Sequence, residues 1–126
     1  MTPQTINVRV KDSVFNPSTS DRTIVVRRAD ATGGKPALYR VYLYLEGDDL
    51  PFVESVRYLL HESFDNRERT IVRSPSNPNC ELVIWTWGLF RVTVTINDKR
   101  GQSFALHRDL QYDRELKSSG AKYQYQ

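Results

Sequence analysis

Short segments in which apolar and polar residues alternate make up most of this chain. Such alternation over about four to eight residues is typical of a β-strand with one buried face. We expect about eight strands, over residues 6–11, 24–26, 39–45, 53–60, 67–72, 81–85, 90–96 and 102–110. No segment shows a long helical period. A helix over 50–59 competes with the fourth strand, but Pro51 and the valine and tyrosine content favour a strand.

Turn residues separate the predicted strands at intervals of roughly 8–12 residues, which is typical of an immunoglobulin-type sandwich. They cluster at residues 16–20, 30–36, 47–49, 74–79 and 97–101. The sequence therefore predicts an all-β fold, an immunoglobulin-like β-sandwich of about eight antiparallel strands. The Cys…Trp…Cys pattern of antibody domains is absent, since the chain has one cysteine, so the prediction concerns the architecture alone.

The predicted faces indicate where the core lies. In 39–45 the odd-numbered residues point inward, and the opposite face (Arg40, Tyr42, Tyr44) is amphipathic and expected to be partly covered. In 53–60 the inward residues are Val56, Tyr58 and Leu60. A length of 126 residues suits one domain. We predict a single domain over 1–116 and a polar, loose C-terminal tail over 117–126.

Charge and cysteine content limit the function classes. The net charge is only +3, although the cations comprise 13 arginines and 5 lysines. Arginine suits carboxylates and phosphates, but this small excess disfavours nucleic-acid binding. Cys80 has no partner for a disulfide, and the first residues lack the features of a signal peptide. We expect a natural start at Met1, no membrane association, and an intracellular location, cytoplasmic if the source is bacterial.

Residues with binding chemistry concentrate in two stretches that each end an apolar run. The first is Leu59-Leu60-His61-Glu62-Ser63-Phe64 and the second is Trp87-Gly88-Leu89-Phe90. Each brings an aromatic ring, and the first also brings a hydroxyl and an imidazole. A pocket forms if these strand ends meet. By contrast, Gly33-Gly34-Lys35 lacks the glycine spacing and the following Ser/Thr of a phosphate-binding loop, so we interpret it as a flexible connection.

These two stretches resemble the motifs of the YEATS domain family. The run Phe52–Phe64 matches an apolar strand that leads into a Leu-x-His-x-Ser-Phe loop, and a basic strand (Arg67-Glu68-Arg69) follows. Thr86-Trp87-Gly88-Leu89-Phe90 is similar to the Gly-aromatic-Gly-x-Phe segment, with Thr86 in place of the first glycine. The similarity spans roughly 39–110. The differences, which include a glycine-rich first loop without its aromatic residue, place the chain with the divergent prokaryotic YEATS-like branch.

The resemblance implies a non-enzymatic reader of acylated lysine or a similar flat amide. It implies that Phe64 and Trp87 sandwich the acyl group and that Ser63 and the backbone N–H at Trp87 bind its amide. It further implies that His61 lines the pocket and that Phe90 supports it. The predicted ligand-binding residues are His61, Ser63, Phe64, Trp87, Gly88 and Phe90. An acylated peptide or other small ligand and a protein partner are expected, in the sensor part of a bacterial signalling or conflict system.

Alternatives remain open at this point. Phe64 and Phe90 could simply be core residues at strand ends. The chain could also be an immunoglobulin-like protein–protein interaction module without an acyl-lysine pocket, which uses a sheet edge or the arginine face while the aromatic pair Phe64 and Trp87 only packs. His61 and Ser63 suggest a catalytic dyad, but no acid is placed to orient the imidazole. We therefore expect no enzyme activity, no cofactor and no metal, His107 being isolated.

Three further expectations concern the surroundings of these loops. Trp85 is expected in the core. Arg67, Arg69 and Arg73 are interpreted as solvated edge charges. An acidic or nucleotide-like ligand held by Arg57, Arg67 or Arg69 is a further alternative, because a basic domain gains nothing electrostatically from basic histone tails.

Overall fold

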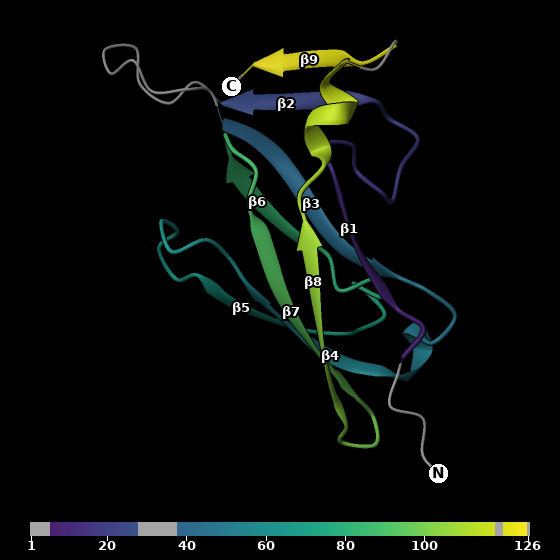
Figure 1. Ribbon diagram of the computed structural model, residues 1–126. Helices are drawn as coiled ribbons and strands as arrows, with labels where there is room; N and C mark the ends of the chain where they lie inside the picture. Colours follow the sequence, from purple (N-terminus) through teal and green to yellow (C-terminus); the bar gives the residue numbers. More distant parts are fainter. Residues whose placement is uncertain (1–5, 28–37, 118–119, 126) are drawn as a thin grey trace. The chain divides into compact units, whose positions relative to one another are not determined.

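The computed structural model describes residues 6–27, 38–117 and 120–125 (Figure 1). The loop predicted over 33–35 lies outside them. In the described part, nine strands and two 3-10 helices follow one another along the chain. They are β1 (Arg9–Ser13), β2 (Thr23–Arg27), β3 (Leu38–Glu46), η1 (Leu50–Phe52), β4 (Val53–Leu59), β5 (Glu68–Val72), β6 (Leu82–Thr86), β7 (Arg91–Asp98), β8 (Ser103–Asp109), η2 (Tyr112–Lys117) and β9 (Lys122–Tyr125).

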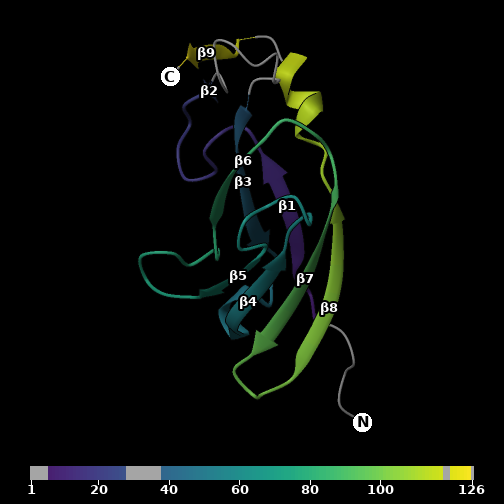
Figure 2. The same cartoon turned by 90° about the vertical axis from the view of Figure 1, so that its left-hand side faces the viewer.

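The strands form two sheets. One has four strands in the order β5-β4-β7-β8, each antiparallel to its neighbour. Figures 1 and 2 both show β7 and β8 as a long hairpin within it. The other has the order β1-β3-β2-β9, with β6 also pairing with β3. In this sheet β2 is antiparallel to β3 and parallel to β9, whose arrow points the same way in Figure 1.

The chain divides into two compact units. The first comprises Met1–Lys11, Tyr44–Leu82 and Phe90–Asp109, and the four-stranded sheet lies wholly within it. The second comprises Asp12–Leu43, Val83–Leu89 and Leu110–Gln126, and it contains β2, η2 and β9.

The predicted inward faces are confirmed in both units. In the first, Val56, Tyr58 and Leu60 are each at most 1% exposed, and the alternate residues of β7 are equally buried. The hydroxyl of Tyr58 donates to the carbonyl of Cys80 at 2.8 Å, so its burial leaves no unpaired polar atom. That burial raises the pKa of Tyr58 well above its ordinary value. In the second unit, Tyr42 is buried together with the apolar face of β3, as expected from its amphipathic pattern.

The two ends of the described chain differ from the predictions. β1 begins at Arg9, later than the predicted strand. The prediction that the C-terminal tail is loose is wrong, because Lys122–Tyr125 forms β9 and its residues pair with Thr23–Val26. All four side chains of β9 are exposed, so backbone pairing with β2 holds the strand and burial contributes little. The domain boundaries over 1–116 remain a prediction.

Gly47 makes the turn after β3 possible. Its φ is +144°, a backbone conformation that L side chains rarely adopt. A Cβ atom at this position would meet the backbone of the incoming N-terminal segment, at the carbonyl oxygen of Asn7 and 2.8 Å from the Cα of Val8. The chain therefore needs glycine here for close approach as well as for conformation.

We predict that Gly47→Ala lowers the free energy of unfolding by about 2–3 kcal/mol, because strain and crowding add. Gly101→Ala is the matched control, since Gly101 also has a positive φ (+86°) but a Cβ atom there would meet nothing within 4 Å. It should cost about 1 kcal/mol. Denaturant unfolding of both variants measures the difference, and equal losses would contradict the crowding at Asn7.

Candidate ligand-binding loops

The loop between β4 and β5 carries three of the predicted site residues. The backbone N–H of Leu60 donates to the carbonyl of Arg67 at 2.8 Å and closes the loop at its base. Within the loop, the N–H of Phe64 donates to the carbonyl of His61 at 3.0 Å and makes a tight turn. Backbone hydrogen bonds therefore fix the path of residues 61–64 before any ligand arrives.

His61 and Ser63 are joined by two hydrogen bonds to one ring nitrogen. The backbone N–H of Ser63 donates to Nδ1 of His61 at 3.1 Å, and the hydroxyl oxygen Oγ lies 2.8 Å from the same Nδ1. A nitrogen that accepts from an N–H carries no proton, so the neutral imidazole holds its proton on Nε2. The Ser63 hydroxyl is then the donor to Nδ1. Its oxygen keeps lone pairs for an outside donor.

Phe90 supports this loop from the position directly before β7. Its ring centroid lies 5.5 Å from that of Phe64 and 5.9 Å from that of His61, with interplanar angles of 55° and 57°. Tilted pairs of this kind are favourable because ring edges meet ring faces. The register of β4 against β7, with Leu59 opposite Thr93, brings Phe90 to the end of the sheet where the loop starts. Phe64 and Phe90 are both half-buried.

Arg67, directly before β5, and Arg69 within it lie at the edge strand of the sheet, as predicted, and they also hold the loop. Arg67 donates through Nε to the carbonyl of Leu60 at 3.2 Å. Arg69 donates to the carbonyls of Asn66 at 2.6 Å and Asp65 at 3.3 Å. A guanidinium offers several donors in a fixed fork, so each side chain hydrogen-bonds to one or two carbonyls of the loop.

Arg73, directly after the edge strand β5, likewise has a structural contact. Its Nε donates to the carbonyl of Pro78 at 2.9 Å, within the loop that follows β5. It therefore has a structural acceptor of the same kind as Arg67 and Arg69. In the sequence, the position of these arginines beside two loops, and not their charge, indicates this structural role.

The Trp87-Gly88 segment follows β6 in the second unit. Trp87 is 65% exposed, as expected for a large aromatic beside glycine. The hydroxyl of Tyr112 donates to the carbonyl of Gly88 at 2.9 Å, which anchors the segment to η2. Burial and the neighbouring phenol of Tyr39 raise the pKa of Tyr112 to about 12, so it remains a donor at neutral pH. The sequence analysis did not identify Tyr112.

Trp85 differs from its predicted place in the core. It is half-buried, and the guanidinium of Arg27 lies 4.1 Å from its ring centroid. A cation over an indole face is a favourable contact. The side chain is therefore covered by an arginine from β2.

The structure thus brings His61, Ser63, Phe64 and Phe90 together in the first unit, while Trp87 and Gly88 belong to the second. Among the described residues, no group of three or more His, Cys, Asp and Glu side chains could hold a metal ion. Within the same residues, no helix is long and apolar enough to cross a membrane.

Comparison with known families decides the identity of the fold. The sequence model of the prokaryotic YEATS domain matches residues 39–111, more than half of the chain. The chain belongs to the prokaryotic YEATS domain family. The match covers the range in which the motif resemblance was found. No curated protein matches.

Solved YEATS domains share the fold. A Yaf9 YEATS domain recognising an H3K122suc peptide is 16% identical, with a TM-score of 0.52 over 86% of this chain and 77% of that one. A Yaf9 YEATS domain bound to H3K27ac is 12% identical, with a TM-score of 0.52 over 87% and 78%. The yeast AF-9 homolog Yaf9 is 14% identical, with a TM-score of 0.51 over 84% and 71%.

At these identities the likeness concerns the fold, and it confirms the predicted immunoglobulin-like β-sandwich. Together with the family match, it supports a reader or binding module in general terms.

We predict that the neutral imidazole of His61 in this YEATS domain carries its proton on Nε2, because Nδ1 accepts two hydrogen bonds. Ring-nitrogen NMR shifts of the labelled protein distinguish the two tautomers. Ser63→Ala keeps the backbone donor and should keep the tautomer. A proton found on Nδ1 in the unmodified protein would contradict the arrangement.

Proposed function

We propose that this YEATS domain is a non-enzymatic reader that binds acylated lysine or a similar flat amide. The proposed ligand contacts are His61, Ser63, Phe64 and Phe90 of the first unit, together with Trp87 and Gly88 of the second. The observation that carries the proposal is the hydrogen bond from the Ser63 N–H to Nδ1 of His61. Because Nδ1 is then an acceptor, the Ser63 hydroxyl also donates a hydrogen bond to it, and the hydroxyl oxygen is left to accept from the N–H that an acyl-lysine amide offers.

The aromatic residues fit a neutral, flat group. Acylation removes the charge of lysine, so a matching site needs ring faces and hydrogen bonds in place of carboxylates. Phe64 is partly exposed and held by Phe90, and Trp87 exposes most of its surface. Each ring contact is worth about 0.5–1.5 kcal/mol beyond burial. A flat, extended acyl group such as crotonyl gains more from such contacts than acetyl.

The expected affinity is modest. One neutral hydrogen bond contributes about 1 kcal/mol net, and association itself has an entropic cost. These terms place the dissociation constant in the micromolar range or above. The solved Yaf9 domains described as bound to H3K27ac or recognising an H3K122suc peptide support an acylated peptide as the class of partner.

Binding without catalysis fits the same loop. A serine nucleophile needs a base that is itself oriented by a third group. In the described part of the chain, no carboxylate hydrogen-bonds to the ring of His61. Because a reader must pass its binding signal to another domain or protein, we also propose a sensor role in a bacterial signalling or conflict system.

The test is an NMR titration of the protein with crotonyl-lysine, acetyl-lysine and unmodified peptides of one sequence. We predict saturable shifts at Ser63, Phe64 and Trp87. The crotonyl-lysine peptide should bind more tightly than the acetyl-lysine peptide, and the unmodified peptide should not bind. Ser63→Ala should weaken crotonyl binding about 5- to 10-fold, the equivalent of one hydrogen bond. Trp87→Ala should weaken it at least as much, through the loss of a ring face.

Ser103→Ala is the matched control, because Ser103 is an exposed serine on β8 in the same unit. It should bind as the unmodified protein does. Absence of shifts at millimolar crotonyl peptide, with folded spectra, would overturn the proposal. That result would favour the alternative, an immunoglobulin-like protein–protein interaction module in which these aromatic residues only pack.

A further inference from the structure

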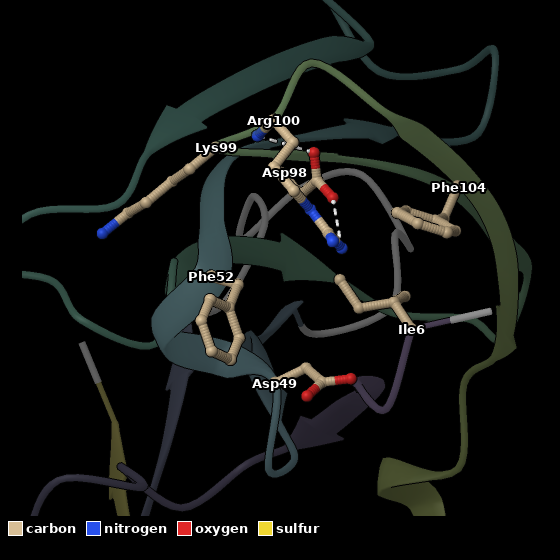
Figure 3. Close-up of a pocket in the computed structure, with 7 residues that line it drawn as sticks. All are labelled: Ile6, Asp49, Phe52, Asp98, Lys99, Arg100 and Phe104. Atoms are coloured by element: carbon tan, nitrogen blue, oxygen red, sulfur yellow. Dashed lines mark hydrogen bonds and ion pairs between the residues drawn. The ribbon is translucent and has the colours of Figure 1, made fainter. Parts of the chain in front are cut away.

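A second concave site lies in the first unit, at the end of the four-stranded sheet away from the 61–64 loop. β4 starts there, directly after η1, and β7 ends there at the hairpin turn. The hollow has a volume of about 320 Å³, at the small end of the range for ligand cavities. Its lining residues, drawn in Figure 3, are Ile6, Asp49, Phe52, Asp98, Lys99, Arg100 and Phe104.

Hydrogen bonds hold the walls of this hollow in place. The N–H of Asp98 donates to the carbonyl of Gln102 at 2.9 Å and closes the hairpin turn. The N–H of Lys99 donates to the carbonyl of Phe52 at 2.9 Å and ties the turn to η1. These contacts between backbone groups fix the path of the chain around the hollow.

Both acidic side chains of the hollow accept hydrogen bonds from the chain, and that of Asp98 is buried by them. The side chain of Asp98 is only 1% exposed, and its Oδ1 accepts the N–H groups of Arg100 at 2.9 Å and Gln102 at 2.8 Å. Burial alone would raise the pKa of Asp98, but these hydrogen bonds and the Arg100 guanidinium outweigh it and lower the pKa. Asp49 accepts the backbone N–H of Asn7 at 2.8 Å.

The basic side chains of the hollow, Lys99 and Arg100, are exposed. The side chain of Arg100 is 69% exposed, and its Nη2 donates one hydrogen bond, of 3.4 Å, to Oδ2 of Asp98. In Figure 3 its guanidinium lies in the middle of the lining residues. The side chain of Lys99 extends away from Arg100 in Figure 3. An incoming molecule therefore meets the donors of Arg100, while the carboxylate of Asp98 lies buried beneath them.

Apolar surface completes the site. Phe52 is 57% exposed, and η1, on which it lies, buries none of its residues. Phe104 is half-buried, as is Ile6. A planar apolar group that covered Phe52 would remove this surface from water, which is favourable in proportion to its area.

We propose that this hollow is a second ligand site, which binds a small carboxylate with a flat apolar body. The carboxylate accepts from the Arg100 guanidinium and the body packs on Phe52 and Ile6. The site is independent of the proposed reader function, which concerns a neutral amide at the other end of the sheet. A free aromatic acid and a peptide ending in phenylalanine both carry this chemistry.

The test titrates the whole chain with phenylpropionate, and with the matching alcohol and amine, by NMR. We expect saturable shifts at Phe52, Arg100 and Phe104 with the acid and at least tenfold weaker binding of the alcohol and the amine. A peptide with a C-terminal phenylalanine should compete with the acid, and its amidated form should not. Equal binding of acid and amine, or no saturable shift with the acid, would overturn the proposal.

Variants locate the two contacts. Arg100→Gln should weaken acid binding at least tenfold, and Arg100→Lys should weaken it less, because a charge remains without the fork. Arg91→Gln is the matched control: Arg91 is 62% exposed in its side chain and pairs with Asp109 at the opposite end of the hairpin.

Phe52→Ala keeps the carbonyl that accepts from Lys99 and should also weaken binding at least tenfold. The amide shifts of Asp98 and Gln102 in the free variants show whether the turn is intact. Unchanged affinity in both Arg100→Gln and Phe52→Ala, with an intact turn, would contradict the site.

Discussion

The antiparallel pairing of β4 with β7 is the constraint on which the first unit depends. Its register sets Leu59 opposite Thr93 at one end and Val53 opposite Asp98 at the other. The first end places Phe90 against the 61–64 loop, and the second places the hairpin turn against η1. Buried side chains alternate along both strands, so a slip by one residue would expose them all. One register therefore positions two chemically different sites.

The two sites differ in what they offer a ligand. At the 61–64 loop, Nδ1 of His61 accepts a hydrogen bond from the Ser63 hydroxyl, which leaves an oxygen acceptor beside aromatic rings. At the hairpin turn, the carboxylate of Asp98 is buried and accepts hydrogen bonds from backbone N–H groups, while the side chain of Arg100 is exposed. In each case a buried or local hydrogen bond decides which polarity the surface presents. The first suits an amide N–H and the second a carboxylate.

Sequence patterns predicted the features that depend on burial. Alternating apolar residues predicted the positions of β3, β4 and β7, and the Leu-x-His-x-Ser-Phe loop indicated the YEATS family. Features that depend on backbone groups leave no such pattern in the sequence. The strand β9 pairs through its backbone and exposes all its side chains. Arg67 and Arg69 donate hydrogen bonds to backbone carbonyls of the loop. The hollow beside Phe52 was missed for a related reason, since one exposed aromatic on a short 3-10 helix has no periodicity.

The central claim, that Ser63 presents an acceptor to an amide N–H, has a direct measurement. It compares a crotonyl-lysine peptide with its ester analogue, in which oxygen replaces the amide nitrogen, on the unmodified protein and on Ser63→Ala. The account predicts that the ester binds at least 5-fold more weakly to the unmodified protein, the loss of one hydrogen bond, and that Ser63→Ala binds both alike. An ester that binds the unmodified protein as tightly as the amide would contradict it.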